Sequence, residues 1–196
     1  PGRSYTTVTL WTGLDPLNMT LDDYAYVSGL LQAEALVDYI TNYRRRMFDS
    51  ASAIFWMFND SWPVTHGWTI VDYYRRRKLA YHPVRRAFQP VTVVVAEEGG
   101  TVTLYGVNDT PTDWTGSVRF GLFALAGARP IDKTQAVTLP ANASTILATF
   151  ASSEWESRGV RTHGAFALLQ QHGKTVAQHR LFRELFKDLT LENPEI

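Results

Sequence analysis

The chain has 196 residues, enough for one large or two small domains, and its 45% content of hydrophobic residues excludes a disordered polymer. Lysine plus arginine and aspartate plus glutamate each number 19, so net charge gives no reason to expect a nucleic acid or an anionic membrane as partner. Neutral partners such as sugars stay possible. Cysteine is absent, which excludes a disulfide framework and thiol chemistry but leaves the compartment unassigned.

No apolar run approaches the length of a membrane span, and no signal-peptide pattern opens the chain. It begins at Pro1 rather than at a methionine, which favours a cut or truncated product. Residues 1–19 are polar, are interrupted by Gly and Pro, and show no clear period. We therefore expect a loop or the remnant of a preceding element there.

A helix is predicted from Thr20 to about Met47. Thr20 and Asp23 have the spacing of a capping box, and apolar residues recur at helical spacing up to Met47. Arg44, Arg45 and Arg46 fall in the last turn, where cations oppose the negative end of the helix dipole. We interpret this triplet as a solvated helix end rather than an anion site.

The next predicted element is a strand over residues 53–58. This run is apolar without alternation and ends at Asn59 and Asp60, as expected of a strand buried on both faces that opens into a polar loop. A helix follows at about Pro83 to Phe88, where Pro83 fits a first turn. Gln89 and Pro90 form the predicted hinge, which divides the chain into residues 1–90 and 91–196.

After Pro90 the apolar period changes from helical to two, which predicts about seven short strands and an immunoglobulin-like sandwich. The runs that support strands are 91–95, 102–104, 118–122, 146–150, 165–169 and 176–181.

The central stretch resembles a known family. Trp56, Asn59, Asp60, Trp62 and Pro63 form a Trp-x-x-Asn-Asp-x-Trp-Pro motif, followed by residues 67–74 (Gly-Trp-Thr-Ile-Val-Asp-Tyr-Tyr) and the helix-like run 78–88. Together they resemble the last strand and last helix of the catalytic barrel in β-mannosidase-like members of glycoside hydrolase family 2. The resemblance implies an α+β fragment: residues 1–90 as the last helix-strand-helix unit of a (β/α)8 barrel, followed by an immunoglobulin-like sandwich.

The resemblance also implies the activity of the parent protein, a retaining exo-β-glycosidase that hydrolyses terminal β-linked sugars. Glycoside hydrolysis needs two carboxylates, and in this family both are glutamates on earlier barrel strands. No catalytic residue is therefore expected in this segment, which should be inactive alone and should need no cofactor. Its expected partners are a carbohydrate and the rest of the parent enzyme.

Four residues are predicted to contribute to the sugar pocket. Trp56 is the first candidate, because an indole face suits the C–H face of a pyranose ring and the resemblance places this residue toward the sugar. In an unrelated fold a core role would be preferred. Asn59, Asp60 and Trp62 are candidates for hydrogen bonds or loop shape. Asp60 and Asp72 could also be proposed as a substitute catalytic pair. A role in ordering the loop is the much stronger interpretation.

The spacing from Pro63 to Trp68 is longer than in many family members, so the mannoside preference is in doubt against glucosaminide, galactoside or glucuronide.

The alternative to an enzyme fragment is a non-catalytic sandwich that binds carbohydrate or protein through exposed aromatics such as Trp114 or Trp155. Three histidines are too scattered for a metal site: His163, His172 and His179.

A barrel strand without its neighbours has unpaired backbone groups. We therefore expect Trp56 and its neighbours either to pack on the sandwich or to mediate self-association, which light scattering would detect.

Overall fold

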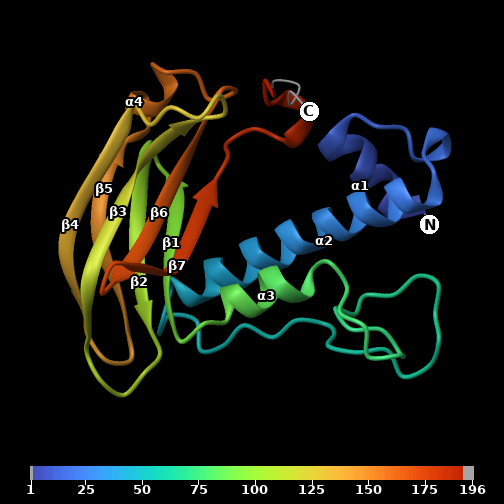
Figure 1. The fold of residues 1–196 in the computed structure, drawn as a ribbon, viewed down its shortest axis with the longest axis horizontal. Coiled ribbons are helices and arrows are strands. Elements are labelled where there is room, and N and C mark those ends of the chain that lie inside the picture. Colours follow the sequence, from blue (N-terminus) through green and yellow to red (C-terminus); the bar gives the residue numbers. More distant parts are fainter. Residues whose placement is uncertain (1, 192–196) are drawn as a thin grey trace. The chain divides into compact units, whose positions relative to one another are not determined.

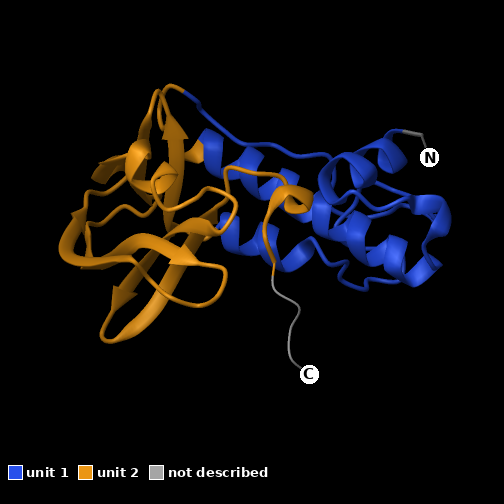
Figure 2. Cartoon of the chain, turned by 90° about the horizontal axis from the view of Figure 1, so that it is seen from above, with its two compact units in different colours: residues 1–43, 50–88 blue, residues 44–49, 89–196 orange. Residues whose placement is uncertain are grey.

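The computed structural model describes residues 2–191 (Figure 1). They form two compact units, shown in separate colours in Figure 2. The first unit holds the chain up to residue 43 together with residues 50–88. The second holds residues 44–49 together with the chain from residue 89 onward.

Helices α1 (Gly2–Thr12), α2 (Leu21–Arg44) and α3 (Tyr81–Ala87) and a 3-10 turn at Pro16–Asn18 make up the regular structure of the first unit. The predicted capping box is confirmed: the Asp23 N–H donates to the Thr20 hydroxyl at 3.1 Å, and that hydroxyl donates to the Asp23 carboxylate at 2.7 Å. Pro83 lies in the first turn of α3, as predicted.

The prediction of a loop over residues 1–19 is wrong, because most of that stretch is helical. Its sequence lacks a helical period, but Val8 is 1% exposed and the Tyr5 ring meets the Tyr24 ring edge to face at 5.4 Å. Gly13 ends α1 with a φ of 73°, and its N–H donates to the Thr9 carbonyl, as in a glycine C-cap. Packing therefore overrides the weak local preference.

Helices α2 and α3 pack together through an apolar cluster that includes part of the connecting chain. Its buried members are Ala33, Ile40, Ile70, Val71, Ala80, Val84 and Ala87, and partly buried Ala53 and Phe55 pack against it.

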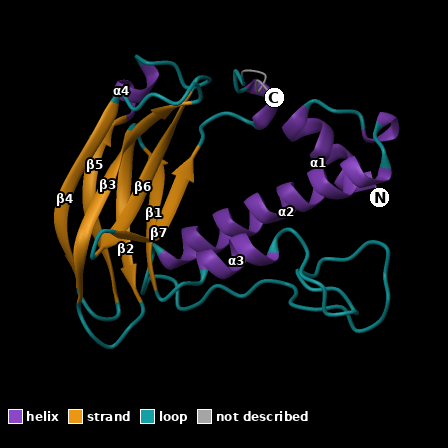
Figure 3. Ribbon diagram, viewed as in Figure 1, coloured by secondary structure: helices purple, strands orange, loops and turns teal. Residues whose placement is uncertain are grey.

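The strand predicted over residues 53–58 does not form, and Figure 3 shows this stretch as loop. A strand exists only where a neighbour accepts and donates its backbone hydrogen bonds. Over the described residues this stretch has no strand partner; the isolated bridge between Asn59 and Val71 comes directly after it. The prediction of burial on both faces is also wrong, because Ile54 and Trp56 are 78% and 76% exposed.

The second unit is a sandwich of two antiparallel sheets, which confirms the predicted architecture. One sheet has the order β1-β2-β5 and the other β4-β3-β6-β7. The strands are β1 (Val91–Glu98), β2 (Thr101–Asn108), β3 (Trp114–Ala124), β4 (Ile131–Leu139), β5 (Ala143–Ala151), β6 (His163–Gln171) and β7 (Lys174–Leu181). Strand β4 was not predicted, because it is an edge strand whose residues 132–136 are all exposed and show no apolar alternation.

Trp155 lies in the short helix α4 (Ser152–Glu156) and is fully buried in the sandwich core, where its indole N–H donates to the His163 carbonyl at 3.0 Å. Trp114 is partly buried against the same core. The suggestion that Trp155 forms an exposed binding surface is therefore wrong.

The basic triplet is not a solvated helix end, because two of its three side chains are buried. The side chains of Arg44 and Arg45 are 7% and 6% exposed. Arg44 pairs with Asp109 at 2.6 Å between Nη2 and Oδ2, and Arg45 pairs with Glu98. Residues 44–49, which continue from α2, therefore belong to the sandwich unit.

Further contacts fix Arg45 in place. Its guanidinium lies over the Tyr105 ring, 5.3 Å from the centroid, and its carbonyl accepts a hydrogen bond from the Ser144 hydroxyl at 2.8 Å. The hydrogen bond and the charge of Arg45 hold the pKa of Glu98 below its ordinary value.

His179 in β7 connects the two sheets. Its Nδ1 accepts a hydrogen bond from the Val95 N–H in β1 at 3.2 Å, so the ring is neutral with its proton on Nε2. Burial of the ring, and next the charge of Arg180, lower the pKa of His179 from 6.5 to about 4.

We expect the sandwich to lose stability as the pH falls from about 6.5 to about 4, because in this window the unfolded chain binds a proton at His179 that the folded chain does not. The free energy of unfolding should drop by about 1–3 kcal/mol from this group, the lower values reflecting partial exposure of the residue. Urea unfolding at pH 4.5 and pH 7 measures the drop. In His179→Asn, whose amide oxygen can replace Nδ1, the drop should shrink; an unchanged drop would assign it to other groups.

Candidate functional site

Residues 53–58 present two different faces. Ala53 and Phe55 pack on the helical cluster, and the Phe55 ring lies 6.1 Å from that of Phe88. The residues that alternate with them, Ile54, Trp56 and Phe58, are 78%, 76% and 58% exposed. Alternation of this kind leaves an indole and a phenyl ring on one open surface.

The loop that follows is closed at its base by backbone hydrogen bonds. The Val71 N–H donates to the Phe58 carbonyl at 2.9 Å, and the Asp60 N–H donates to the Val71 carbonyl at 3.1 Å. Within the loop, Trp62 and Trp68 are 66% and 65% exposed. The closed base holds these two indoles on one short loop.

A buried carboxylate organises the inside of this loop. The side chain of Asp60 is 7% exposed and lies 3.2 Å from the Lys78 ammonium. The Thr69 hydroxyl donates to Asp60 at 2.8 Å and accepts from Lys78 at 2.6 Å. A Cβ on Gly67 would lie 3.1 Å from an Asp60 carboxylate oxygen, so a larger residue there would crowd this network. Asp60 thus shapes the loop.

Two polar side chains fix the outside of the loop. Gln32 of α2 donates to the Trp68 carbonyl at 2.7 Å, and the Ser4 hydroxyl of α1 lies 3.0 Å from His66 Nε2. The loop is therefore tied to both helices that precede it in the chain.

Asp72 holds the next turn. Its carboxylate accepts hydrogen bonds from the Arg76 N–H at 2.8 Å and from Arg76 Nε at 2.6 Å. Burial raises the pKa of Asp72, but the hydrogen bonds and charge of Arg76 outweigh it and hold that pKa below its ordinary value. Asp72 stays ionised and structural, within the turn rather than on the following helix.

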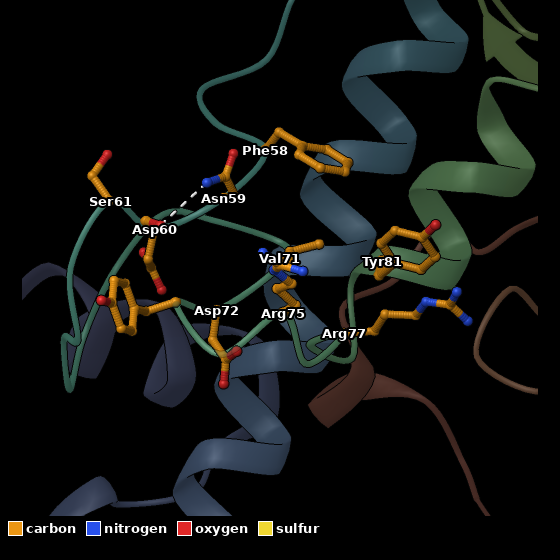
Figure 4. A pocket seen from close by; sticks show the side chains of 10 residues that line it. Phe58, Asn59, Asp60, Ser61, Val71, Asp72, Arg75, Arg77 and Tyr81 are labelled. Atoms are coloured by element: carbon orange, nitrogen blue, oxygen red, sulfur yellow. Dashed lines mark hydrogen bonds between the residues drawn. The ribbon is translucent and has the colours of Figure 1, made fainter.

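These elements enclose a hollow of about 560 Å³ (Figure 4). In that view Phe58 and Tyr81 lie on one side and Asp60 and Ser61 on the other. The lining residues are Phe58, Asn59, Asp60, Ser61, Val71, Asp72, Tyr73, Arg75, Arg77 and Tyr81.

The structure brings two of the four predicted residues, Asn59 and Asp60, into the hollow, whereas Trp56 and Trp62 lie outside its lining. The Asn59 amide N–H donates to the Asp60 carbonyl at 3.2 Å, which leaves its side-chain oxygen open. Arg75 and Arg77 also line the hollow but were not among the predicted site residues, because nothing in the sequence marks these two side chains as part of a pocket.

The hollow alone does not provide glycosidase chemistry. A general acid needs a carboxyl whose pKa is raised, yet Asp60 is paired with a cation and the pKa of Asp72 is lowered. No glutamate is among the residues that line the hollow. Over the described residues, no group of histidine and acidic side chains could hold a metal ion, and no helix has the length and apolarity of a membrane span.

The sandwich matches a known family. Residues 100–188 match the family described as the Mannosidase Ig/CBM-like domain. Beta-mannosidase B of Aspergillus niger is 40% identical over 81 residues, which are 40% of this chain and 10% of that protein. Beta-mannosidase B of Thermothelomyces thermophilus is 38% identical over 78 residues, 37% of this chain and 9% of that protein.

A solved structure extends the similarity to nearly the whole chain. The β-D-mannosidase of Dictyoglomus thermophilum superposes with a TM-score of 0.89 and 27% identity, covering 98% of this chain and 23% of that enzyme. The chain is similar to the C-terminal portion of a β-mannosidase. The resemblance stated from the motif around Trp56 is confirmed.

The β-mannosidase-like chain spans about a tenth of the length of the curated relatives that it matches. Its fold also recurs in the exo-chitosanase of Amycolatopsis orientalis, with a TM-score of 0.72 and 20% identity over 93% of this chain and 21% of that enzyme.

Proposed function

We propose that this chain is the C-terminal portion of a retaining exo-β-glycosidase that removes terminal β-linked sugars, with a β-mannoside as the expected substrate. The alternating burial of residues 53–58 carries the proposal, because the last strand of a barrel turns one face to the helices and the other to the barrel interior. The similarity to β-mannosidases supports it. Residues 1–90 are then the end of the barrel and the sandwich supports it.

Each predicted residue has a role in this proposal. Trp56 stacks its exposed indole on the C–H face of the terminal sugar, and Trp62 forms a wall of the same pocket. Asn59 offers its open amide oxygen to a sugar hydroxyl. Asp60 acts through the loop that it orders with Thr69 and Lys78.

The two catalytic glutamates come from the rest of the parent enzyme. Hydrolysis requires one carboxyl to protonate the leaving oxygen and a second to attack, and the carboxylates of the hollow are both tied to cations. The chain alone is therefore inactive, and no cofactor takes part.

The test compares release of nitrophenol from β-mannoside, β-glucosaminide, β-galactoside and β-glucuronide by this chain and by the full-length enzyme. We expect turnover by the full-length enzyme alone, fastest on the β-mannoside. Light scattering on the isolated chain belongs in the same experiment, because its open face of Ile54, Trp56 and Phe58 is expected to cause self-association.

Turnover by the isolated chain would overturn the assignment of the glutamates and return attention to Asp60 and Asp72. Failure of the full-length enzyme on all four glycosides would overturn the glycosidase itself.

A further inference from the structure

We propose that the hollow bounded by Arg75 and Arg77 binds an anionic group, the carboxylate or sulfate of a charged sugar. As a statement about substrate, this inference rests on the proposed glycosidase, and it adds that the sugar next to the terminal residue is acidic. As a statement about binding, it concerns residues 58–81 alone, all of which lie in the first unit.

The charges that line the hollow do not balance within the described chain. Two carboxylates, of Asp60 and Asp72, and two arginines, Arg75 and Arg77, line the hollow. Both carboxylates are already neutralised by cations outside the lining, since Lys78 pairs with Asp60 at 3.2 Å and Arg76 with Asp72 at 2.6 Å.

The two lining arginines have no such compensation. Among residues 2–191, no carboxylate forms an ion pair with Arg75 or Arg77. Two arginines therefore line the hollow without an ion-pair partner among the described residues, although the chain as a whole carries no net charge.

The backbone and an aromatic ring hold these arginines in position. Arg75 has a φ of 65°, a left-handed conformation, and its N–H donates to the Asp72 carbonyl at 3.0 Å. The Arg77 guanidinium lies over the Tyr81 ring, 4.9 Å from its centroid. Both come from the short turn between Asp72 and α3, as Figure 4 shows.

The other residues that line the hollow suit a charged sugar. A guanidinium presents paired donors that match the oxygens of a carboxylate or a sulfate. Asn59 and Ser61 add neutral polar groups suited to hydroxyls, and Phe58 and Tyr81 add apolar surface. A hollow of about 560 Å³ is of the size that holds a small ligand. Together these features fit an acidic sugar better than a neutral one.

The test is a titration of the 196-residue chain, followed through backbone amide chemical shifts at low salt, with three disaccharides. The two acidic probes are mannosyl-β-1,4-glucuronate and mannosyl-β-1,4-glucose sulfated at O6 of the glucose. The neutral probe is mannosyl-β-1,4-glucose. We expect at least one acidic probe to bind about 10-fold more tightly than the neutral probe, to shift amides of residues 58–77, and to weaken as salt rises. The ratio between the two acidic probes identifies the preferred oxyanion.

Arg75→Gln should remove most of this preference and Arg77→Gln part of it, while Arg3→Gln, which removes an exposed cation outside the hollow, should leave it intact. Equal affinity for all three probes, or an unchanged preference in Arg75→Gln, would overturn the inference. Because the readout is binding by the chain itself, such a result leaves the glycosidase assignment standing. Absence of hydrolysis by the full-length enzyme would instead remove the substrate interpretation.

Discussion

Replacing Trp56 by alanine in the full-length enzyme should lower kcat/KM for the β-glycoside by about 10- to 100-fold. This loss follows if the indole is buried against the sugar, because burial of a large apolar side chain contributes about 1.5–3 kcal/mol. In the chain the indole is 76% exposed, so it is available for such a contact and contributes little to the fold. Steady-state kinetics on nitrophenyl β-mannoside measure the loss.

A matched control separates sugar contact from loop disturbance. Trp68 is 65% exposed in the same region but lies outside the open face of Ile54, Trp56 and Phe58, so Trp68→Ala should change kcat/KM by less than about 3-fold. Both variants should melt within a few degrees of the parent. Equal losses in the two variants would show that Trp56 acts through the loop rather than on the sugar.

Local signals predicted helices α2 and α3 and most strands of the sandwich. The Thr20 capping box marks the start of α2 because its hydrogen bonds are made within four residues. The sandwich followed from apolar alternation, which reports burial of one sheet face in the same unit. Exposed β4 carries no such alternation and was missed.

The wrong predictions concern segments whose structure depends on packing partners far away in the sequence. Residues 53–58 are apolar on both faces, yet only the face of Ala53 and Phe55 finds a partner in the described chain. The apolar run therefore predicts burial correctly only for that face. Helix α1 shows the reverse case, in which an irregular polar sequence is helical because Val8 and Tyr5 pack.

The candidate site was predicted in part for the same reason. Asn59 and Asp60 were found from a short contiguous motif. The partner of Asp60 was not, because Lys78 lies 18 positions further along the chain and meets it only after the loop closes. The charge excess at Arg75 and Arg77 likewise becomes visible only once Asp60 and Asp72 are assigned to Lys78 and Arg76.

Arg44 and Asp109 provide the largest expected stability effect. In Asp109→Ala the Arg44 guanidinium, 7% exposed, loses its carboxylate and keeps the Pro90 carbonyl 3.4 Å from Nη2, so we expect the free energy of unfolding to fall by about 1–3 kcal/mol. Arg44→Met should cost less, because it removes the charge and keeps an apolar stem in the same space. Urea unfolding of the isolated chain measures both changes.

The double variant and a second ion pair decide whether burial is the cause. Arg44→Met combined with Asp109→Ala should be more stable than the sum of the single losses predicts, because no charge is then left without its partner. Arg119 and Asp132 form an ion pair with two hydrogen bonds in the same unit, but the Arg119 side chain is 34% exposed. Asp132→Ala should therefore cost no more than about 1 kcal/mol. Equal losses in Asp109→Ala and Asp132→Ala, together with additive losses at Arg44, would mean that the charge of Arg44 is solvated and that residues 44–49 are held by packing alone.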